Sequence, residues 1–555
     1  MSGDIAGTPD LVLVAGTAWT GLTGHPTADA VAIAAGRLVA VGAARDVRAL
    51  AGPRTRIVEL PGAMILPGFQ DAHVHPTHGG LDRTRCDLHG ARGADAVVAA
   101  VRAYAEAHPE APWILGGGWY MADFPGGTPS RELLDAAVPD RPAFLANRDV
   151  HGAWANTRAL EALGIGAGTP DPPDGRIERA ADGSPQGTLH EGAFEDARAR
   201  VPAPDADEML RALLAGQSYL HACGITAWQD AWVAPADLDA YARAIDRGLL
   251  MGRVRGALWW DREEGLDQVE SLVERREAAR RLPGARFVAG SVKVMADGVF
   301  ENGTAAMLDP YLDRHGQPTG ACGISFVDRE TLREAATTLD ALGFQVHVHA
   351  IGDRATHDAL DAFEAAIASN GRGGNRHHIA HLQVVHPADV PRFAALGVTA
   401  TIQPFWACRD GQMVDLTIPF LGPERSGWQY PFGSLARAGA RLAGGSDWSV
   451  STANVLEEVQ VAVTRSYPDP DVDPAPFLPE EAIDVETGLR AFTAGAAWVN
   501  HLDEVTGTLE PGKAADLVVL DRDVLAVDPA GLRGARVLLT LVDGRPVHAA
   551  PGYGW

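Results

Sequence analysis

The chain has 555 residues, more than one compact domain usually contains, so a large domain with a smaller companion is expected. An apolar content of 46% and 62 glycines are typical of a globular α/β protein and exclude a disordered one. The formal charge of -25 argues against nucleic acid or an anionic membrane as the main partner.

The chain shows no targeting or membrane-spanning signal. Its first residues, MSGDIAGTPD, carry no basic region of the kind that opens a signal peptide, and no apolar run reaches the ~18 residues that would span a bilayer. Cys86, Cys223, Cys322 and Cys408 are widely scattered and form no C-x-x-C, as expected of free thiols in a reducing compartment. We therefore expect a soluble, cytoplasmic protein.

Both ends of the chain have the pattern of short β-strands. Apolar runs punctuated by Gly and Asp occur at residues 11–16, 30–42, 55–68, 507–523 and 535–548. We expect residues 1–66 and 500–555 to assemble into one small composite β-sandwich.

The middle of the chain, residues 67–499, alternates apolar strands with helix-like segments, which is typical of a parallel α/β sheet or barrel. Eight candidate strands follow one another at residues 69–75, 224–230, 253–260, 291–298, 344–353, 377–383, 397–404 and 441–448. This pattern predicts a (β/α)₈ barrel of the TIM type. Residues 80–215 are too long for one loop between a strand and a helix, and they predict an inserted subdomain over the barrel mouth after strand one.

Histidine, lysine and aspartate recur where these strands end. The segment GFQDAHVHPTH holds His73 and His75, and alternate residues of a strand share a face, so both side chains can reach one ion. Lys293 lies within a strand, where an inward-facing charge is costly unless it is paired or chemically removed. His347 and His349 follow on strand five, His377, His378 and His381 on strand six, and Asp447 on strand eight. One His-x-His pair is a weak signal, but the recurrence across five strands predicts a metal site.

In this order the residues resemble the metal-dependent amidohydrolase superfamily. The segments GGGWY, DVHGAWANTRAL, GITAWQD, VKVMADG, HAIGDRA, HLQ, GSDWSV and PGKAADLVVLD look more narrowly like the branch that contains N-substituted formamide deformylases. The resemblance covers roughly residues 10–550. It implies a (β/α)₈ barrel and hydrolysis by a metal-activated water.

The resemblance also implies a role for each matching position. His73 and His75 match ligands of one metal ion, and Asp447 matches an aspartate that is both a ligand and a proton carrier. Lys293 matches the lysine that carries a carbamate in binuclear relatives and bridges two ions.

His349 and His381 match the ligands on strands five and six. His347 faces the same way as His349 by strand parity, and a hydrogen-bonded interior histidine is favoured over an additional site residue. The implied cofactor is a pair of divalent ions, most simply two Zn²⁺ bridged by carboxylated Lys293, with Mn²⁺, Fe²⁺ or Co²⁺ also compatible with nitrogen and oxygen ligands.

Further residues are candidates for contact with the substrate. His151 and Glu191 lie in stretches that resemble the branch, and Gln403 closes strand seven, where its amide could hydrogen-bond a carbonyl. Trp119 and Trp448 lie in segments expected at the mouth, where tryptophan would suit an apolar or aromatic substrate.

The sequence thus predicts an amidohydrolase that cleaves a non-peptide carbon–nitrogen bond of a small N-substituted amide or formamide. A mononuclear deaminase or cyclic-amide hydrolase on the same barrel stays open, as does a catalytically silent ligand-binding barrel. No phosphate-binding loop and no G-x-S-x-G motif occurs, so nucleotide and serine hydrolase chemistry are unsupported. The expected partner is a small molecule, and a homodimer is the commonest assembly for such a protein.

Overall fold

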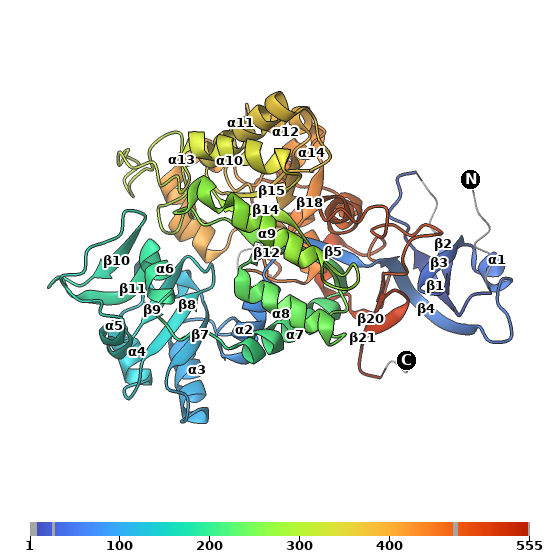
Figure 1. Ribbon diagram of the computed structural model, residues 1–555, viewed down its shortest axis with the longest axis horizontal. Helices are drawn as coiled ribbons and strands as arrows, with labels where there is room; N and C mark the ends of the chain where they lie inside the picture. Colours follow the sequence, from blue (N-terminus) through green and yellow to red (C-terminus); the bar gives the residue numbers. More distant parts are fainter. Residues whose placement is uncertain (1–7, 25–27, 470–474, 553–555) are drawn as a thin grey trace.

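Eight parallel strands form the central sheet, and they coincide with the eight segments predicted from the sequence (Figure 1). The structure is a computed structural model that describes residues 8–24, 28–469 and 475–552. The strands follow one another around a nearly closed barrel in the order β5 (Phe69–Val74), β12 (Ile225–Val233), β13 (Arg253–Trp259), β14 (Phe287–Met295), β15 (Gln345–Ala350), β16 (His378–His381), β17 (Thr399–Ile402) and β18 (Leu442–Gly444). The prediction of a (β/α)₈ barrel is confirmed.

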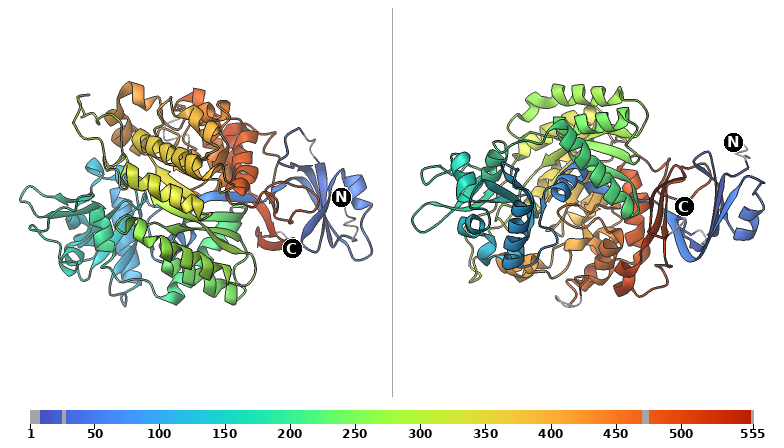
Figure 2. Two further views of the ribbon diagram at one scale, coloured as in Figure 1. Left: turned by 45° about the horizontal axis from the view of Figure 1, so that its top comes forward. Right: turned by 90° about the horizontal axis from the view of Figure 1, so that it is seen from below.

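The barrel is wrapped by helices that follow its strands (Figure 2). The main ones are α7 (Ala206–Ala222), α8 (Pro235–Asp246), α9 (Val269–Arg280), α10 (Arg329–Ala341), α11 (Asp353–Asn370) and α15 (Val455–Thr464). Helix α10 shows how the sequence sets them: the Asp328 side chain accepts hydrogen bonds from the backbone N–H groups of Glu330 and Thr331. Leu332 and Leu339, spaced for one helical face, are buried in the largest apolar cluster.

The barrel closes between its last strand and its first through two backbone hydrogen bonds. The N–H of Asp447 donates to the carbonyl of His73 at 2.8 Å, and the N–H of His75 donates to the carbonyl of Trp448 at 2.9 Å. Two glycines precede Asp447, and a Cβ on the second, Gly445, would lie 2.8 Å from the Cβ of His73. The seam therefore joins three of the predicted metal ligands directly.

Strands from both chain ends lie in one seven-stranded sheet beside the barrel (Figure 1). Its order is β21 (Arg545–Ala549), β20 (Val537–Val542), β19 (Leu517–Leu520), β4 (Arg56–Pro67), β1 (Leu11–Ala18), β2 (Ala28–Ala34) and β3 (Arg37–Gly42). Leu11 and Leu13 pack in one apolar cluster while Val12 and Val14 pack in another, as the alternation of a strand requires. Both faces of the sheet are thus apolar. The sheet is joined to the barrel through a single residue, Gly68, between β4 and barrel strand β5.

A second α/β unit interrupts the chain between α2 (Pro76–Thr84) and α7. Its six-stranded sheet has the order β10 (Gly175–Arg179), β11 (Pro185–Glu191), β9 (Gly152–Ala155), β8 (Ala143–Asn147), β7 (Ile114–Trp119) and β6 (Cys86–Asp87). Helices α3 (Ala94–Ala107), α4 (Arg131–Ala137), α5 (Thr157–Ala162) and α6 (Gly192–Arg198) accompany it. This unit lies on the side of the barrel away from the chain-end sheet (Figure 1).

Across the described ranges, the helices are all too short or too polar to cross a bilayer. The four cysteines are free, and Cys86 and Cys408 are buried.

Candidate metal centre and substrate cavity

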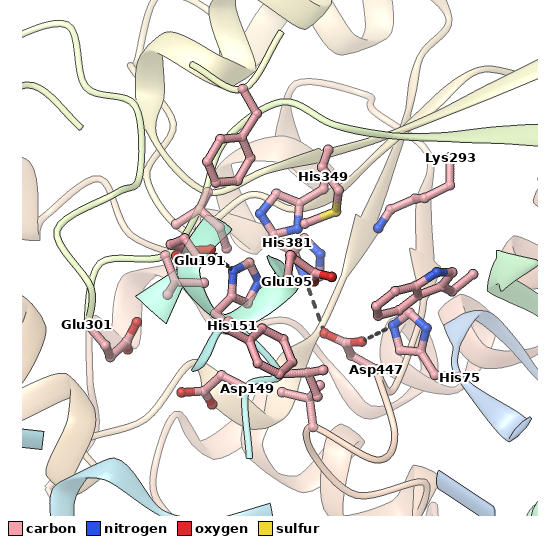
Figure 3. A pocket seen from close by; sticks show the side chains of 18 of the residues that line it. His75, Asp149, His151, Glu191, Glu195, Lys293, Glu301, His349, His381 and Asp447 are labelled. Carbon is pink, nitrogen blue, oxygen red and sulfur yellow. Dashed lines mark hydrogen bonds and ion pairs between the residues drawn. The ribbon is translucent and has the colours of Figure 1, made fainter. Parts of the chain in front are cut away.

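A cavity of about 450 Å³ opens at the carboxyl ends of the barrel strands, where barrel enzymes place their active sites. All six residues predicted as metal ligands line it: His73, His75, Lys293, His349, His381 and Asp447. The inserted unit completes the wall with residues such as Asp149, His151 and Glu191 (Figure 3). The topology therefore brings together, in one cavity wall, side chains that lie up to several hundred residues apart in the sequence.

Asp447 is the point on which the histidines converge. Its Oδ1 lies 2.9 Å from Nε2 of His75 and 3.3 Å from Nε2 of His73, and its Oδ2 lies 3.8 Å from Nδ1 of His381 (Figure 3). One ligand atom each from His73, His381 and Asp447 lies within 4.8 Å of the others, and all three side chains are buried. Within the described ranges this is the one group of three or more such residues with the spacing of a metal site.

The donor set fits a divalent cation. His75 Nδ1 and His381 Nδ1 are buried yet have no hydrogen-bond partner among the described residues, an arrangement that costs free energy unless a ligand supplies one. Burial lowers the pKa of His73 to about 3 and holds the pKa of His381 well below its usual value, so both rings are neutral and can ligate. Burial opposes the charge of Asp447, but contacts with His73 and His75 hold its pKa well below the usual range.

The backbone is strained where these residues lie. His381 has a φ of 80°, Asp447 a φ of 53° and Glu191 a φ of 50°, all in the left-handed region that residues with a Cβ rarely adopt. Such conformations persist where the surrounding structure imposes them, and they concentrate at functional sites.

Lys293 is buried at 2% exposure and faces the cavity from β14. Burial lowers the pKa of Lys293 to about 8, although the charge of Asp447 acts in the opposite direction. Its amine makes no hydrogen bond or ion pair with a described residue. An inward-facing amine that forms no ion pair is the costly arrangement anticipated from the sequence, and it leaves the nitrogen available for chemistry.

A chain of buried hydrogen bonds beneath the centre fixes the orientation of His73. Gln345 donates from Nε2 to the backbone carbonyls of Arg376 and Val499, at 2.8 and 2.9 Å. Its Oε1 is therefore the acceptor that Gln229 Nε2 approaches at 3.1 Å, so Gln229 Oε1 must itself accept hydrogen bonds.

His347 and His378 supply those hydrogen bonds. His347 Nδ1 lies 2.8 Å and His378 Nε2 3.1 Å from Gln229 Oε1, so each of these nitrogens carries a hydrogen. His347 Nε2 is then an acceptor, and it takes a hydrogen bond from His73 Nδ1 at 2.9 Å. The remaining nitrogen of His73, Nε2, is left with its lone pair toward Asp447. The interpretation of His347 as a hydrogen-bonded interior residue is confirmed.

Two buried carboxylates, Asp71 and Asp297, hold the backbone around the predicted ligands. The Asp71 carboxylate accepts hydrogen bonds from the N–H of His73 at 2.9 Å and from Ser446 Oγ at 2.5 Å, tying β5 to the loop that carries Asp447. Asp297 accepts from the N–H groups of Ile351 and Gly352, at 3.0 and 2.8 Å, directly after His349.

His151 and Glu191 form a buried ion pair that faces the cavity. His151 Nδ1 lies 2.8 Å from Glu191 Oε2, while Glu191 Oε1 accepts from Thr304 Oγ1 at 2.6 Å and from Asn302 Nδ2 at 2.9 Å. Burial alone would lower the pKa of His151, but the charge and hydrogen bond of Glu191 raise it to about 9. The imidazole is therefore protonated at neutral pH. The structure places both of these predicted substrate residues in the cavity wall.

Three predicted substrate residues lie elsewhere. Trp119 is in the core of the inserted unit, where its Nε1 donates to the carbonyl of Leu145 at 2.9 Å. Trp448 turns from the cavity and packs 4.7 Å from the ring of Tyr219. Gln403 is buried beneath the site, and its Oε1 accepts from the N–H of His381 at 2.7 Å, so it supports a predicted ligand. The sequence places these residues near the strand ends, but their side-chain directions depend on packing.

The cavity is also lined by four polar residues that the sequence did not identify. Asp149, Glu301, Asp410 and Gln412 come from loops after strands β8, β14 and β17. Nothing in the sequence marked them beyond their position in polar, glycine-containing loops. Trp232, Trp259 and Trp406 add an aromatic surface, with Trp232 stacked 4.6 Å from Trp259.

Comparison with known proteins gives the class to which this fold and site belong. A family described as the amidohydrolase family matches residues 56–548. The Arabidopsis thaliana protein LONG AFTER FAR-RED 3 is 31% identical over 97% of this chain and 91% of its own length. The N-substituted formamide deformylase of Arthrobacter pascens is 27% identical over 96% of this chain and 97% of its own length. Among solved structures, an uncharacterised metal-dependent hydrolase from Pyrococcus horikoshii has a TM-score of 0.73 at 27% identity, covering 94% of this chain and 99% of its own.

The fold is thus that of a metal-dependent hydrolase, and His73, His381 and Asp447 have the spacing of a metal site. The chain belongs to the amidohydrolase family and is an enzyme that hydrolyses carbon–nitrogen bonds other than peptide bonds.

Proposed function

We propose that the protein is a binuclear hydrolase of small N-substituted amides, and that an N-substituted formamide is the first substrate to test. The observation that carries this proposal is the convergence of His73, His75 and His381 on Asp447 beneath an open cavity, with buried ligand atoms that lack partners. The formamide assignment is supported by likeness to the Arthrobacter pascens deformylase along almost the whole of both chains.

Six residues would hold the metal ions: His73, His75, Lys293, His349, His381 and Asp447. Divalent ions bound there would polarise the substrate carbonyl and lower the pKa of water toward ~7. Zn²⁺ suits this mixed nitrogen and oxygen set, and Mn²⁺, Fe²⁺ or Co²⁺ would also suit it.

Lys293 would bridge the ions as a carbamate formed with CO₂. Only two of the 47 lysine and arginine residues in the chain are lysines, Lys293 and Lys513. A chain that otherwise uses arginine keeps an amine at this buried position, and an amine can form a carbamate whereas a guanidinium remains protonated. The carbamate would replace a buried cation with an anionic oxygen ligand.

The chain's own groups would move protons and orient the substrate. Asp447, ionised and aimed at the centre of the ligand group, would accept a proton from the attacking water at Oδ1 and pass it to the leaving nitrogen, because an amide anion leaves poorly. His151 uses Nδ1 for Glu191, so its Nε2–H is the donor available for a substrate oxygen. Trp232 and Trp406 would pack against the apolar part of the substrate.

The alternative of a mononuclear deaminase or cyclic-amide hydrolase differs at Lys293. A mononuclear enzyme does not need a bridging ligand, so Lys293→Ala would leave its metal in place. The position of Lys293 in the cavity wall, where it forms no ion pair with a described residue, favours the binuclear enzyme.

The test combines metal analysis with hydrolysis of matched substrates. We expect two equivalents of tightly bound divalent metal, and release of benzylamine from N-benzylformamide faster than from N-benzylacetamide. One equivalent would favour the mononuclear alternative over the binuclear enzyme, and less than one would overturn the metal site altogether. Bound metal without hydrolysis of any amide would instead favour a silent ligand-binding barrel.

A further inference from the structure

The wall of the cavity farthest from Lys293 is acidic. Figure 3 shows Asp149 and Glu301 on the opposite side of the view from Lys293 and His75, with His151 and Glu191 between them. Asp410 joins Asp149 and Glu301 in the cavity lining. In the described part of the chain, no ion pair links any of the three carboxylates to a basic side chain.

Neighbouring cations are already engaged in other contacts. His151 is paired with Glu191 at 2.8 Å, and Arg148 donates from Nε to the backbone carbonyl of Val450 at 2.8 Å. Burial raises the pKa of Asp149 to about 6, although the charges of His151 and Arg148 act in the opposite direction, and burial together with the charge of Asp149 raises the pKa of Glu301 to about 7.

Gln412 provides an independent sign that a ligand is missing. Its side chain lines the cavity at 8% exposure, and Nε2 donates to Asp149 Oδ2 at 3.2 Å and to Glu301 Oε1 at 3.4 Å. Its Oε1 has no hydrogen-bond partner among the described residues. The carbonyl of Gln412 is therefore a buried acceptor without a donor, and the second oxygens of the partly exposed Asp149 and Glu301 can accept hydrogen bonds beside it.

We propose that this wall is a subsite for a monovalent organic cation, an alkylammonium or guanidinium group on the part of the substrate remote from the scissile amide. Such a group carries several N–H donors and a positive charge, which complements three acceptors and two unpaired carboxylates. A metal ion fits less well, because the described carboxylates of this wall do not come close enough together to form a metal-binding group. The inference rests on the proposed amide hydrolase and narrows its substrates to amides that bear a cationic tail.

Binding of two isosteric probes to the metal-loaded enzyme tests the subsite without turnover. Hexylguanidinium and hexylurea have nearly the same shape, but the guanidinium has a positive charge and five N–H donors where the urea has three N–H donors and a carbonyl. The guanidinium stays protonated and does not ligate metals. By calorimetry we expect the guanidinium to bind about tenfold more tightly. In the Asp149→Asn/Glu301→Gln double variant this ratio should fall to about one. Asp239→Asn, which removes an exposed charge from α8, should leave it unchanged.

A ratio near one in the wild-type enzyme, or an unchanged ratio in the double variant, would overturn the subsite. Should the double variant fail to fold, the two single variants carry the test, and each should lower the ratio about threefold.

Hydrolysis separates this inference from the proposed reaction. We expect N-formyl-1,6-diaminohexane to have a lower KM than N-hexylformamide, with the difference lost in the double variant. Hydrolysis of both without a difference in KM contradicts only the cation subsite. A retained guanidinium preference with no hydrolysis of either formamide contradicts only the proposed reaction.

Discussion

His73 Nδ1 donates to His347 Nε2 across 2.9 Å, and this contact decides which nitrogen of His73 faces the candidate metal centre. The donor and acceptor roles are set at the far end of the chain of hydrogen bonds, where Gln345 is anchored to two backbone carbonyls. The backbone carbonyls thus fix the donor and acceptor roles of Gln345, then those of Gln229 and His347, and finally leave the lone pair of His73 Nε2 facing the centre.

Gln229→Leu should loosen the metal without unfolding the barrel. Without its acceptor, His347 can rotate or change tautomer, and His73 loses its fixed orientation, so we expect metal affinity to fall about 10- to 100-fold. Chelator competition measures this affinity, and the visible spectrum of the Co²⁺-loaded variant should shift as well. Gln217→Leu is the matched control, since Gln217 is also buried and hydrogen-bonded but lies on α7, away from the cavity. Equal metal affinity in the two variants would show that His347 does not orient His73 for metal binding.

The proposed carbamate on Lys293 would be directly observable, because the chain has only two lysines. In protein labelled with ¹³C- and ¹⁵N-lysine, one of two side-chain signals should move when bicarbonate is supplied, and ¹³C-bicarbonate should add a carbamate resonance. Lys513→Arg should leave that resonance in place, because Lys513 is already paired with Glu510 at 2.9 Å. Lys293→Ala should abolish it and lower metal content and activity together. Retention of both metal and activity would refute the bridge.

Gly445→Ala should displace β5, the strand that carries the predicted ligand His73. A Cβ there would lie 2.8 Å from His73 Cβ and 3.0 Å from its backbone nitrogen, and neither atom can move without shifting β5. We expect a loss of about 1–3 kcal/mol in the free energy of unfolding, together with weaker metal binding. Gly374→Ala is the control, because a Cβ at Gly374 would meet no atom within 4 Å. Urea unfolding and metal titration of both variants check the prediction, which an undisturbed Gly445→Ala protein would contradict.

The His151–Glu191 ion pair should contribute to the free energy of unfolding at neutral pH, and this contribution should be lost at alkaline pH. The pKa of His151 is raised from 6.5 to about 9 in the folded protein, so its stabilisation is fully present below pH 6.5 and disappears as the pH rises through 9. In metal-stripped protein, Glu191→Gln should therefore destabilise at pH 6 and have a smaller effect at pH 10. Denaturant unfolding at both pH values measures this, while NMR should show the pKa of His151 falling in the variant. A destabilisation that is the same at both pH values would show that the pair contributes no charge effect.

The barrel could be predicted because its signals are local. Each strand is a short apolar run between turn residues, and in β15 the histidines at alternate positions share a face by the geometry of the strand alone. His73 lies in β5, and His75 follows directly after that strand. Parallel strands bring their carboxyl ends to one edge, so His73, His349 and Asp447 could be expected together without knowledge of any contact.

The tryptophans mark the limit of that reasoning. Trp119 and Trp232 lie in similar sequence contexts near strand ends, yet Trp119 fills the core of the inserted unit and Trp232 lines the cavity. A side chain as large as tryptophan is placed by the layer that packs against it, and the sequence does not show which layer that is.

The sequence by itself determined the barrel and the order of its strands, because strand periodicity and parallel topology translate directly into position. The resemblance to the amidohydrolases then singled out the six residues that line the centre. Only the tertiary structure decided the tautomer chain from Gln345 to His73 and the acidic wall around Gln412. Both depend on contacts between segments more than a hundred residues apart, and such contacts form only when the barrel closes and the inserted unit packs over its mouth.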